Sequence, residues 1–189
     1  MEQKAAEAPG GTGAAPRAYG FLTAVDSASH GIFGGYLLVD PLGRPLEFHC
    51  TAPVKVSRAQ QILFGSTLQT HLHGQQIGAT LLAEGSIVPE VVLTDLDSML
   101  HVRSHTSLPV ALVRAAAGGT SAGTAAVAAG MGGGSGFSFV VGGASVSPHA
   151  SDASREELLR EQLAELAAVV DLCEPFERIR AAIDEAQRH

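Results

Sequence analysis

The spacing of apolar residues changes near Thr51, and this change limits the possible folds more than any other feature of the sequence. From Tyr19 to Thr51 short apolar runs are separated by turn residues, which is typical of β-strands. After Ser57 the apolar residues recur at helical spacing, and at Glu90 a compact apolar run returns. The sequence therefore predicts an α/β fold that begins with strands, continues with helices and returns to a buried strand.

Three strands are expected in the first part of the chain, over residues 19–25, 33–39 and 46–51. The last two are joined by Asp40-Pro41-Leu42-Gly43-Arg44, because Pro presets φ at the second turn position and Gly tolerates a positive φ. Residues 33–51 thus form a predicted β-hairpin. Gly34 and Gly35 within it indicate a bulge or a close approach of the backbone to another element.

Two helical stretches follow, over residues 58–64 and 66–83, with Ser57 and Gln60 spaced as in a capping box. Gly74 and Gly78 lie four residues apart in the second stretch and predict close packing against a strand. The apolar residues of that stretch share one face: Leu68, Leu72, Ile77, Leu81 and Leu82.

The domain is expected to end with strand, short helix and strand over residues 90–94, 95–101 and 109–113. Asp95 serves as the cap of the short helix. Such a unit implies a right-handed parallel crossover. The predicted order is β-β-β-α-α-β-α-β in a small mixed sheet.

Composition divides the rest of the chain. Residues 1–16 are rich in Ala, Gly and Pro and are expected to be disordered, and residues 17–115 form the α/β domain. Residues 116–150 are mostly Gly, Ala and Ser, which predicts a flexible linker. One apolar run at 137–141 interrupts it and is a candidate for an additional docked strand. Residues 151–189 form an amphipathic helical tail.

The tail carries a short heptad seam and two alternative roles. Ser154 and Glu157 are spaced as a capping box, and Pro175 is expected to begin a second helix that carries Phe176, Ile179 and Ile183. The tail either folds back on the domain or associates with itself or a protein partner as a coiled coil. The seam that would carry this association consists of Leu159, Leu163, Leu166, Val170 and Cys173.

Charge, cysteine content and hydropathy restrict the class of protein. The net charge is −7, and residues 151–189 hold ten acidic and five basic side chains. Without a basic stripe, nucleic acid is not an expected partner. Cys50 and Cys173 do not form a disulfide framework, the first residues lack a signal-peptide pattern, and no apolar run reaches membrane-spanning length. A cytoplasmic protein without a membrane segment is expected.

Several short motifs resemble the ribonuclease-H-like superfamily over residues 19–113. Ala24-Val25-Asp26-Ser27 resembles the first-strand aspartate motif, and Phe33-Gly34-Gly35-Tyr36 opens the second strand. Ser57-Arg58-Ala59-Gln60-Gln61 opens the first helix, and Val92-Leu93-Thr94-Asp95 resembles the aspartate that ends the fourth strand. The resemblance implies two-metal nuclease or transferase chemistry on nucleic acids, with Asp26 and Asp95 as catalytic metal ligands for Mg²⁺ or Mn²⁺.

The chain departs from that family at the helix carboxylate, where it has Gln60 and Gln61. An amide oxygen is neutral and a poorer ligand for a hard cation. The ordinary alternative is that Asp26 opens a turn and Asp95 caps a helix.

A zinc site is a further possibility that the spacing does not favour. The side chains of Glu47 and His49 point to one face of their strand, and Cys50 points to the other. His71 and His73 are two residues apart and do not face each other on a helix. His101 and His105 are four apart and could face each other, but Ser104-His105-Thr106 is expected to leave the helix.

These observations lead to two functional hypotheses. The first is a non-catalytic binding or assembly module without a cofactor, in which the helical tail associates with itself or a protein partner. The alternative is a divalent-metal-dependent nuclease of ribonuclease-H-like type that uses Asp26 and Asp95.

Overall fold

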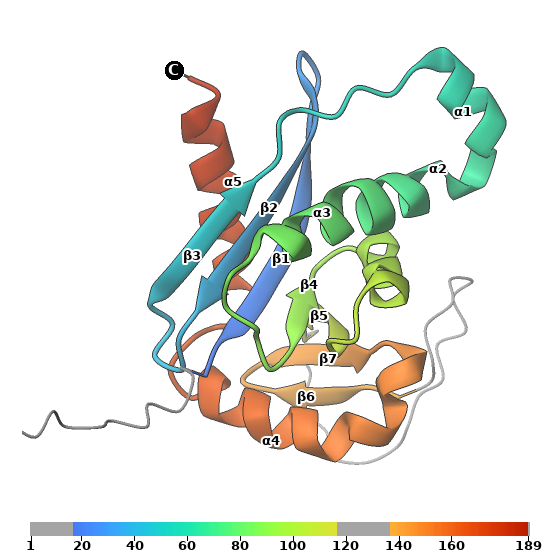
Figure 1. Ribbon diagram of the computed structural model, residues 1–189. Coiled ribbons are helices and arrows are strands. Elements are labelled where there is room, and N and C mark those ends of the chain that lie inside the picture. The colour runs from blue at the N-terminus through green and yellow to red at the C-terminus, as the bar shows by residue number, and fades with distance from the viewer. Residues whose placement is uncertain (1–16, 117–136, 189) are drawn as a thin grey trace, which may run out of the picture.

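A computed structural model describes residues 17–116 and 137–188 of the chain. Its centre is a seven-stranded mixed sheet in the order β3-β2-β1-β4-β5-β7-β6, with α3 in front of it and α5 behind it (Figure 1). This confirms the predicted α/β class. The strands are β1 (Tyr19–Ser27), β2 (Gly31–Val39), β3 (Pro45–Cys50), β4 (Val92–Thr94), β5 (Val110–Ala115), β6 (Phe139–Val141) and β7 (Ala144–Pro148).

The helices lie on both faces of this sheet. A helical segment joins the loop after β3 to the loop before β4. Its geometry changes along its length between α-helix, 3₁₀-helix and π-helix. It consists of α1 (Arg58–Phe64), η1 (Gly65–Thr67), α2 (Leu68–Thr70), the π-helical η2 (His71–Ala79) and α3 (Thr80–Glu84). The remaining helices are η3 (Asp97–His105), η4 (Ala150–Arg155), α4 (Glu156–Ala167) and α5 (Glu174–Ala186).

The first three strands form an antiparallel meander, and β1, β4 and β5 run parallel as neighbours. The predicted β2–β3 hairpin is confirmed. Asp40 closes its turn, because its Oδ1 accepts hydrogen bonds from the backbone N–H groups of Leu42 and Arg44, both at 2.9 Å. Gly43 adopts a φ of 74°, the left-handed conformation that the turn requires.

Two apolar layers enclose the sheet. The side of the sheet that faces η2, α3 and η3 contributes Leu22, Tyr36 and Leu38, which pack with Ile77 and Met99. The opposite side packs against α4 and α5 and includes residues such as Tyr19, Phe21, Leu37, Leu163, Phe176 and Ile179. The rings of Phe21 and Phe176 meet edge to face with centroids 5.4 Å apart.

The helices approach β2 closely at Gly34 and Gly35, as the sequence pattern predicts. A Cβ atom on Gly34 would lie 2.1 Å from Cγ2 of Ile77, and one on Gly35 would lie 2.2 Å from Cγ2 of Ile179. Both distances are shorter than van der Waals contact. The two glycines therefore let η2 and α5 pack on opposite faces of the same strand.

The prediction that Gly74 and Gly78 pack against a strand is wrong. Their near neighbours belong to η3: a Cβ on Gly74 would lie 3.0 Å from Cβ of His101, and one on Gly78 would lie 2.8 Å from Cγ2 of Val102. Small residues four apart indicate a close contact, but they do not identify the element that makes it. Here they bring two helical segments together.

The segment 116–150, expected as a linker, contributes two strands where the structure describes it. Phe139, Ala144 and Val146 are buried in the core beside β5, and Gly142 and Gly143 form the turn between β6 and β7 with positive φ angles. Residues 117–136 of this predicted linker, and residues 1–16 of the predicted disordered terminus, lie outside the described residues.

The tail is packed on the sheet of its own chain. In its predicted heptad seam Leu159, Leu163, Leu166 and Val170 are buried, and Cys173 is half-buried against the same core. Association through these side chains would require α4 to leave the sheet.

The ends of the tail helices confirm one prediction and correct another. The expected Ser154 capping box is wrong, because η4 precedes α4 and Arg155 stands at the N-cap without a side-chain hydrogen bond. Pro175 lies in the first turn of α5, as expected. None of the helices in the described ranges has the length and hydropathy of a membrane span.

Candidate functional site

A polar cavity opens at the carboxyl ends of the parallel strands β1 and β4, beside the helical segments η2 and η3. Its volume is about 710 Å³. The residues that line it come from β1, the helical segment before α3, η3 and the end of β7: Ala24, Asp26, Ser66, Gln69, Thr70, His73, Asp95, Leu96, Asp97, Ser98, Leu100, His101 and His149. The carboxyl edge of parallel strands is where α/β proteins commonly bind ligands.

Asp26 lies near the end of β1 and not in the turn after it, because β1 continues to Ser27. The side chain of Asp26 points to the same face of the sheet as that of Ala24, two residues earlier. Ala24 pairs with Gly34, whose close neighbour is Ile77 of η2, so this is the face covered by η2. Asp26 is exposed, and its carboxylate has no hydrogen-bond or ion-pair partner among the described residues.

Asp95 follows β4 directly and is held by two partners on the other side of the sheet. The hydroxyl of Thr23 donates a 2.6 Å hydrogen bond to Oδ1 of Asp95, and the guanidinium of Arg180 forms an ion pair with Oδ2. Arg180 belongs to α5 of the tail. The expected role of Asp95 as a helix cap is wrong, since Leu96 stands at the N-cap of η3 and has no side-chain cap.

The parallel pairing of β1 and β4 thus brings Asp26 and Asp95 to one cavity, but it does not complete a carboxylate set. Among the described residues no group of three or more His, Cys, Asp or Glu side chains could hold a metal ion. Asp97 also lines the cavity, and its carboxylate pairs with Arg114. The described residues therefore do not fit a two-metal centre.

Gln60 and Gln61, which occupy the position of the family's helix carboxylate in the sequence, do not line the cavity. They belong to α1, which Figure 1 shows well away from the sheet. Gln60 completes the predicted capping box instead: its backbone N–H donates to Oγ of Ser57 at 3.2 Å, and its side chain accepts from the N–H of Ser57 at 2.9 Å. Gln69 is the glutamine that reaches the cavity.

Two histidines give the cavity uncharged hydrogen-bonding groups. His73 of η2 is buried, and its Nδ1 lies 2.6 Å from the hydroxyl of Ser98. Burial lowers the pKa of His73, although the nearby carboxylate of Asp26 partly opposes the shift. Burial also lowers the pKa of His149, which follows β7. Both shifts favour the neutral form of the imidazole.

Sequence reasoning missed the roles of these two histidines. The sequence places His73 only beside His71, in a zinc site that their spacing does not favour. The π-helical geometry of η2, which changes which residues face inward, cannot be read from that spacing. His149 lies within the expected linker, near its end. The signal that could have identified its position is the alternation of Ala144, Val146 and Pro148, all of which are buried in β7.

The other residues considered for a zinc site do not gather into one group among the described residues. Nε2 of His49 is 3.1 Å from Oε2 of Glu47 on β3, whereas Cys50 is exposed. His71 stacks on Phe64 with ring centroids 4.3 Å apart. His101 lines the cavity near His73 and His149, and His105 does not.

No protein-family model matches the chain, and no curated protein matches it either.

Proposed function

We propose that this chain is a non-catalytic binding module whose ligand site is the polar cavity at the carboxyl edge of β1 and β4. The observation that carries the proposal is the ion pair between Arg180 and Asp95. A two-metal centre needs its carboxylates ionised and available to the cations. The guanidinium of Arg180, which belongs to the tail helix α5, would compete with a metal ion for the carboxylate of Asp95.

The lining of the cavity suggests the class of ligand. Ser66, Gln69 and Thr70 offer hydroxyl and amide groups, and His73 and His149 add neutral imidazoles. The three carboxylates of the cavity disfavour anions, and two of them already have arginine partners. A ligand that bears several hydroxyl groups or an amine fits this chemistry. The volume of about 710 Å³ lies within the range of small-molecule sites.

The sheet supports a ribonuclease-H-like ancestry for the module. Its first five strands follow the order β3-β2-β1-β4-β5, with β2 antiparallel to β1 and with β4 and β5 parallel to it. The cavity lies at the edge where the resemblance expects the catalytic aspartates. In this reading β7 and β6 are additions to the sheet, and the site has changed from metal chemistry to ligand binding.

Nuclear magnetic resonance can test the proposal with chemically defined probes. Putrescine, glucose and inorganic phosphate represent an amine, a polyol and an anion. We expect putrescine or glucose to shift the amide signals of Thr70, Ser98 and His101, and phosphate to leave them unchanged. Asp26→Asn should weaken putrescine binding, while Asp184→Asn on the exposed side of α5 should not. If neither putrescine nor glucose shifts the signals of the cavity residues, the proposal is wrong.

The alternative is a nuclease that depends on Mg²⁺ or Mn²⁺ and uses Asp26 and Asp95. The observation that favours it is that both aspartates line the same cavity. Its test is cleavage of single-stranded and double-stranded DNA and RNA with Mg²⁺ or Mn²⁺. Metal-dependent cleavage that disappears in Asp26→Ala would support the nuclease, and no cleavage of any substrate would oppose it.

A cytoplasmic location belongs to the same proposal. Both cysteines of the chain are free, and Cys50 is exposed, which suits a reducing compartment. Fractionation of the cells that make the protein would test this, with recovery from the membrane or external fraction as the contrary result.

A further inference from the structure

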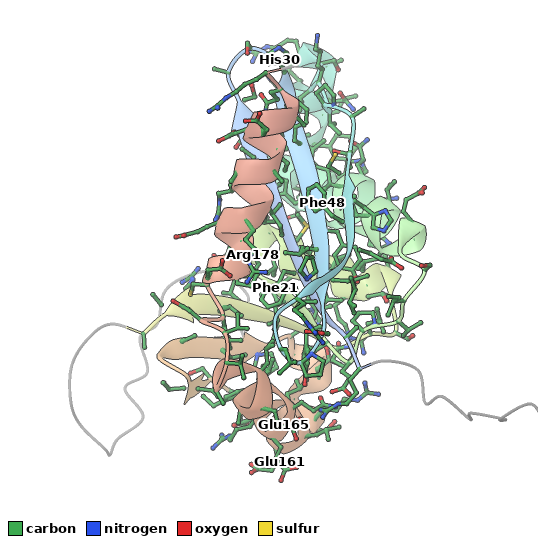
Figure 2. All side chains as sticks on the ribbon, turned by 90° about the vertical axis from the view of Figure 1, so that its left-hand side faces the viewer. Phe21, His30, Phe48, Glu161, Glu165 and Arg178 are labelled. Carbon is green, nitrogen blue, oxygen red and sulfur yellow. The ribbon has the colours of Figure 1, made fainter. Side chains whose placement is uncertain are left out.

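The strand β3 is an edge of the sheet, and its side chains on the α5 face of the sheet are apolar and exposed. Within the described ranges β3 pairs with β2 alone. Leu46, Phe48 and Cys50 alternate along it and are all exposed, with Phe48 at 42%. Figure 2 looks onto this edge, with Phe48 labelled. An exposed apolar edge strand is a template for pairing with another strand.

The backbone of β3 directs its unused hydrogen-bonding groups outward at the same residues. Antiparallel pairs alternate between hydrogen-bonded and non-hydrogen-bonded positions. The N–H of Thr51 donates to the carbonyl of Gly34 at 3.0 Å, so the N–H and C=O groups of His49 and Glu47 also point toward β2. The backbone groups of Phe48 and Cys50 therefore point away from the sheet.

The side chains of β3 are complementary to a second copy of the same strand. An antiparallel pair centred on Phe48 places Phe48 opposite Phe48 of the second copy. It places Leu46 opposite Cys50, which joins apolar to apolar on the α5 face. On the other face it places Glu47 of one copy opposite His49 of the other, beside the pair that each copy forms between Oε2 of its own Glu47 and Nε2 of its own His49 at 3.1 Å. In each chain the carboxylate of Glu47 also accepts hydrogen bonds from Ser86. A twofold axis repeats each of these contacts.

We propose that the protein forms a symmetric dimer in which two β3 strands pair in antiparallel orientation about Phe48. The two sheets then join into one continuous sheet across the dimer axis. Such an isologous contact closes on itself and leaves neither β3 edge exposed. The inference is independent of the ligand site, because none of the residues that line the cavity belongs to β3.

The opposite edge of the sheet is a poorer surface for this kind of pairing. Its strand, β6, has three residues against six in β3. The guanidinium of Arg160 from α4 lies 5.1 Å from the ring centre of Phe139 on that strand. Val140 of β6 is nevertheless exposed and apolar, which makes it a matched control position.

Sedimentation equilibrium on the full chain tests the dimer. We expect the wild-type protein to have a mass of 38.8 kDa, twice the 19.4 kDa of one chain. Phe48→Lys should lower the mass toward 19.4 kDa, because it puts two positive charges opposite each other. Val140→Lys should leave the dimer unchanged. A monomeric wild-type protein, or a dimer that Phe48→Lys leaves intact, overturns the proposal.

Disulfide trapping tests the register without depending on the folding of Phe48→Lys. In a Cys173→Ser background, Leu46→Cys places a thiol opposite Cys50 of the second copy. Within one strand these two thiols are four residues apart, roughly 13 Å, which is too far for an internal disulfide. Oxidation should yield a covalent dimer that reductant dissolves. If Leu46→Cys forms no covalent dimer, or if the control Leu158→Cys cross-links equally well or better, this register is wrong.

Discussion

Arg180 and Asp95 lie 85 residues apart in the sequence and form an ion pair that joins the tail helix α5 to the carboxyl end of β4. The same carboxylate accepts a hydrogen bond from Thr23 of β1. Three elements thus meet at one side chain. The tail therefore holds one of the carboxylates that line the cavity, in addition to covering the sheet.

Loss of this ion pair should cost little stability. The side chain of Arg180 is 41% exposed and that of Asp95 is 19% exposed, so solvent screens their attraction. We expect Arg180→Ala to lower the free energy of unfolding by about 1 kcal/mol, measured by urea denaturation. Arg188→Ala, which removes a more exposed partner of Glu185, should have a smaller effect. If the two variants lower the free energy of unfolding equally, the ion pair of Arg180 with Asp95 contributes no more stability than an exposed pair.

The buried seam of α4 predicts a large difference between two leucines of one helix. Leu163 is fully buried and Leu158 is 53% exposed. Leu163→Ala should lower the free energy of unfolding by about 3 kcal/mol, whereas Leu158→Ala should change it by less than about 0.5 kcal/mol. Thermal or urea denaturation measures both. If Leu163→Ala dissolved an oligomer and left the stability of the monomer unchanged, the seam would be an association surface.

The contact between Gly34 and Ile77 predicts coupled substitutions. Gly34→Ala adds a methyl group where Ile77 leaves no space, and we expect a loss of about 2 kcal/mol. Ile77→Val removes the δ-methyl but keeps Cγ2, the nearest atom, whereas Ile77→Ala removes Cγ2 itself. The double variant Gly34→Ala with Ile77→Ala should therefore lose less stability than the sum of its two single changes. Simple additivity in urea denaturation would contradict this close packing.

Burial of His73 predicts a loss of stability in mild acid. Its folded pKa is lowered, so the unfolded chain binds more protons as the pH falls below the ordinary histidine pKa of about 6.5. The free energy of unfolding should therefore decrease from that pH down to the folded pKa. His73→Gln should show a shallower decrease than the wild-type protein. An identical slope in the two proteins would contradict the burial of an uncharged imidazole.

A second measurement tests the cause of the shift at His73. The carboxylate of Asp26 favours the protonated imidazole and opposes the effect of burial. Asp26→Asn should therefore lower the pKa of His73 further, as followed by the pH dependence of its imidazole proton resonances. A rise in that pKa would contradict the arrangement of the two side chains in the cavity.

Local signals were enough to predict most of the sheet. The turn at Asp40 and Gly43 fixed the β2–β3 hairpin, and the apolar runs before Asp95 and after Pro109 identified β4 and β5. Gly34 and Gly35 correctly indicated close approach of other elements. Each of these signals depends on neighbouring residues in the sequence, which is why it could be recognised without a structure.

The remaining features depend on contacts between distant parts of the chain. The Gly-rich composition around Gly142 and Gly143 is typical of a linker, and only the docking of Phe139 and Val146 on β5 makes β6 and β7 strands of the sheet. The partner of Asp95 could not be predicted either, because Arg180 reaches it only after α5 has packed on β1 and β2. The ends of β1 and β4 could be predicted to carry Asp26 and Asp95. That Asp95 is held by Thr23 and Arg180, while Asp26 is exposed, could not be predicted.

The binding of Mn²⁺, followed by electron paramagnetic resonance of the free ion, most directly tests whether the carboxyl edge is a ligand site or a metal centre. We predict that the wild-type protein leaves the free Mn²⁺ signal unchanged at matched concentrations of metal and protein, and that Asp26→Ala behaves in the same way. A stoichiometric loss of the free Mn²⁺ signal in the wild-type protein, abolished by Asp26→Ala, would contradict the proposed binding module.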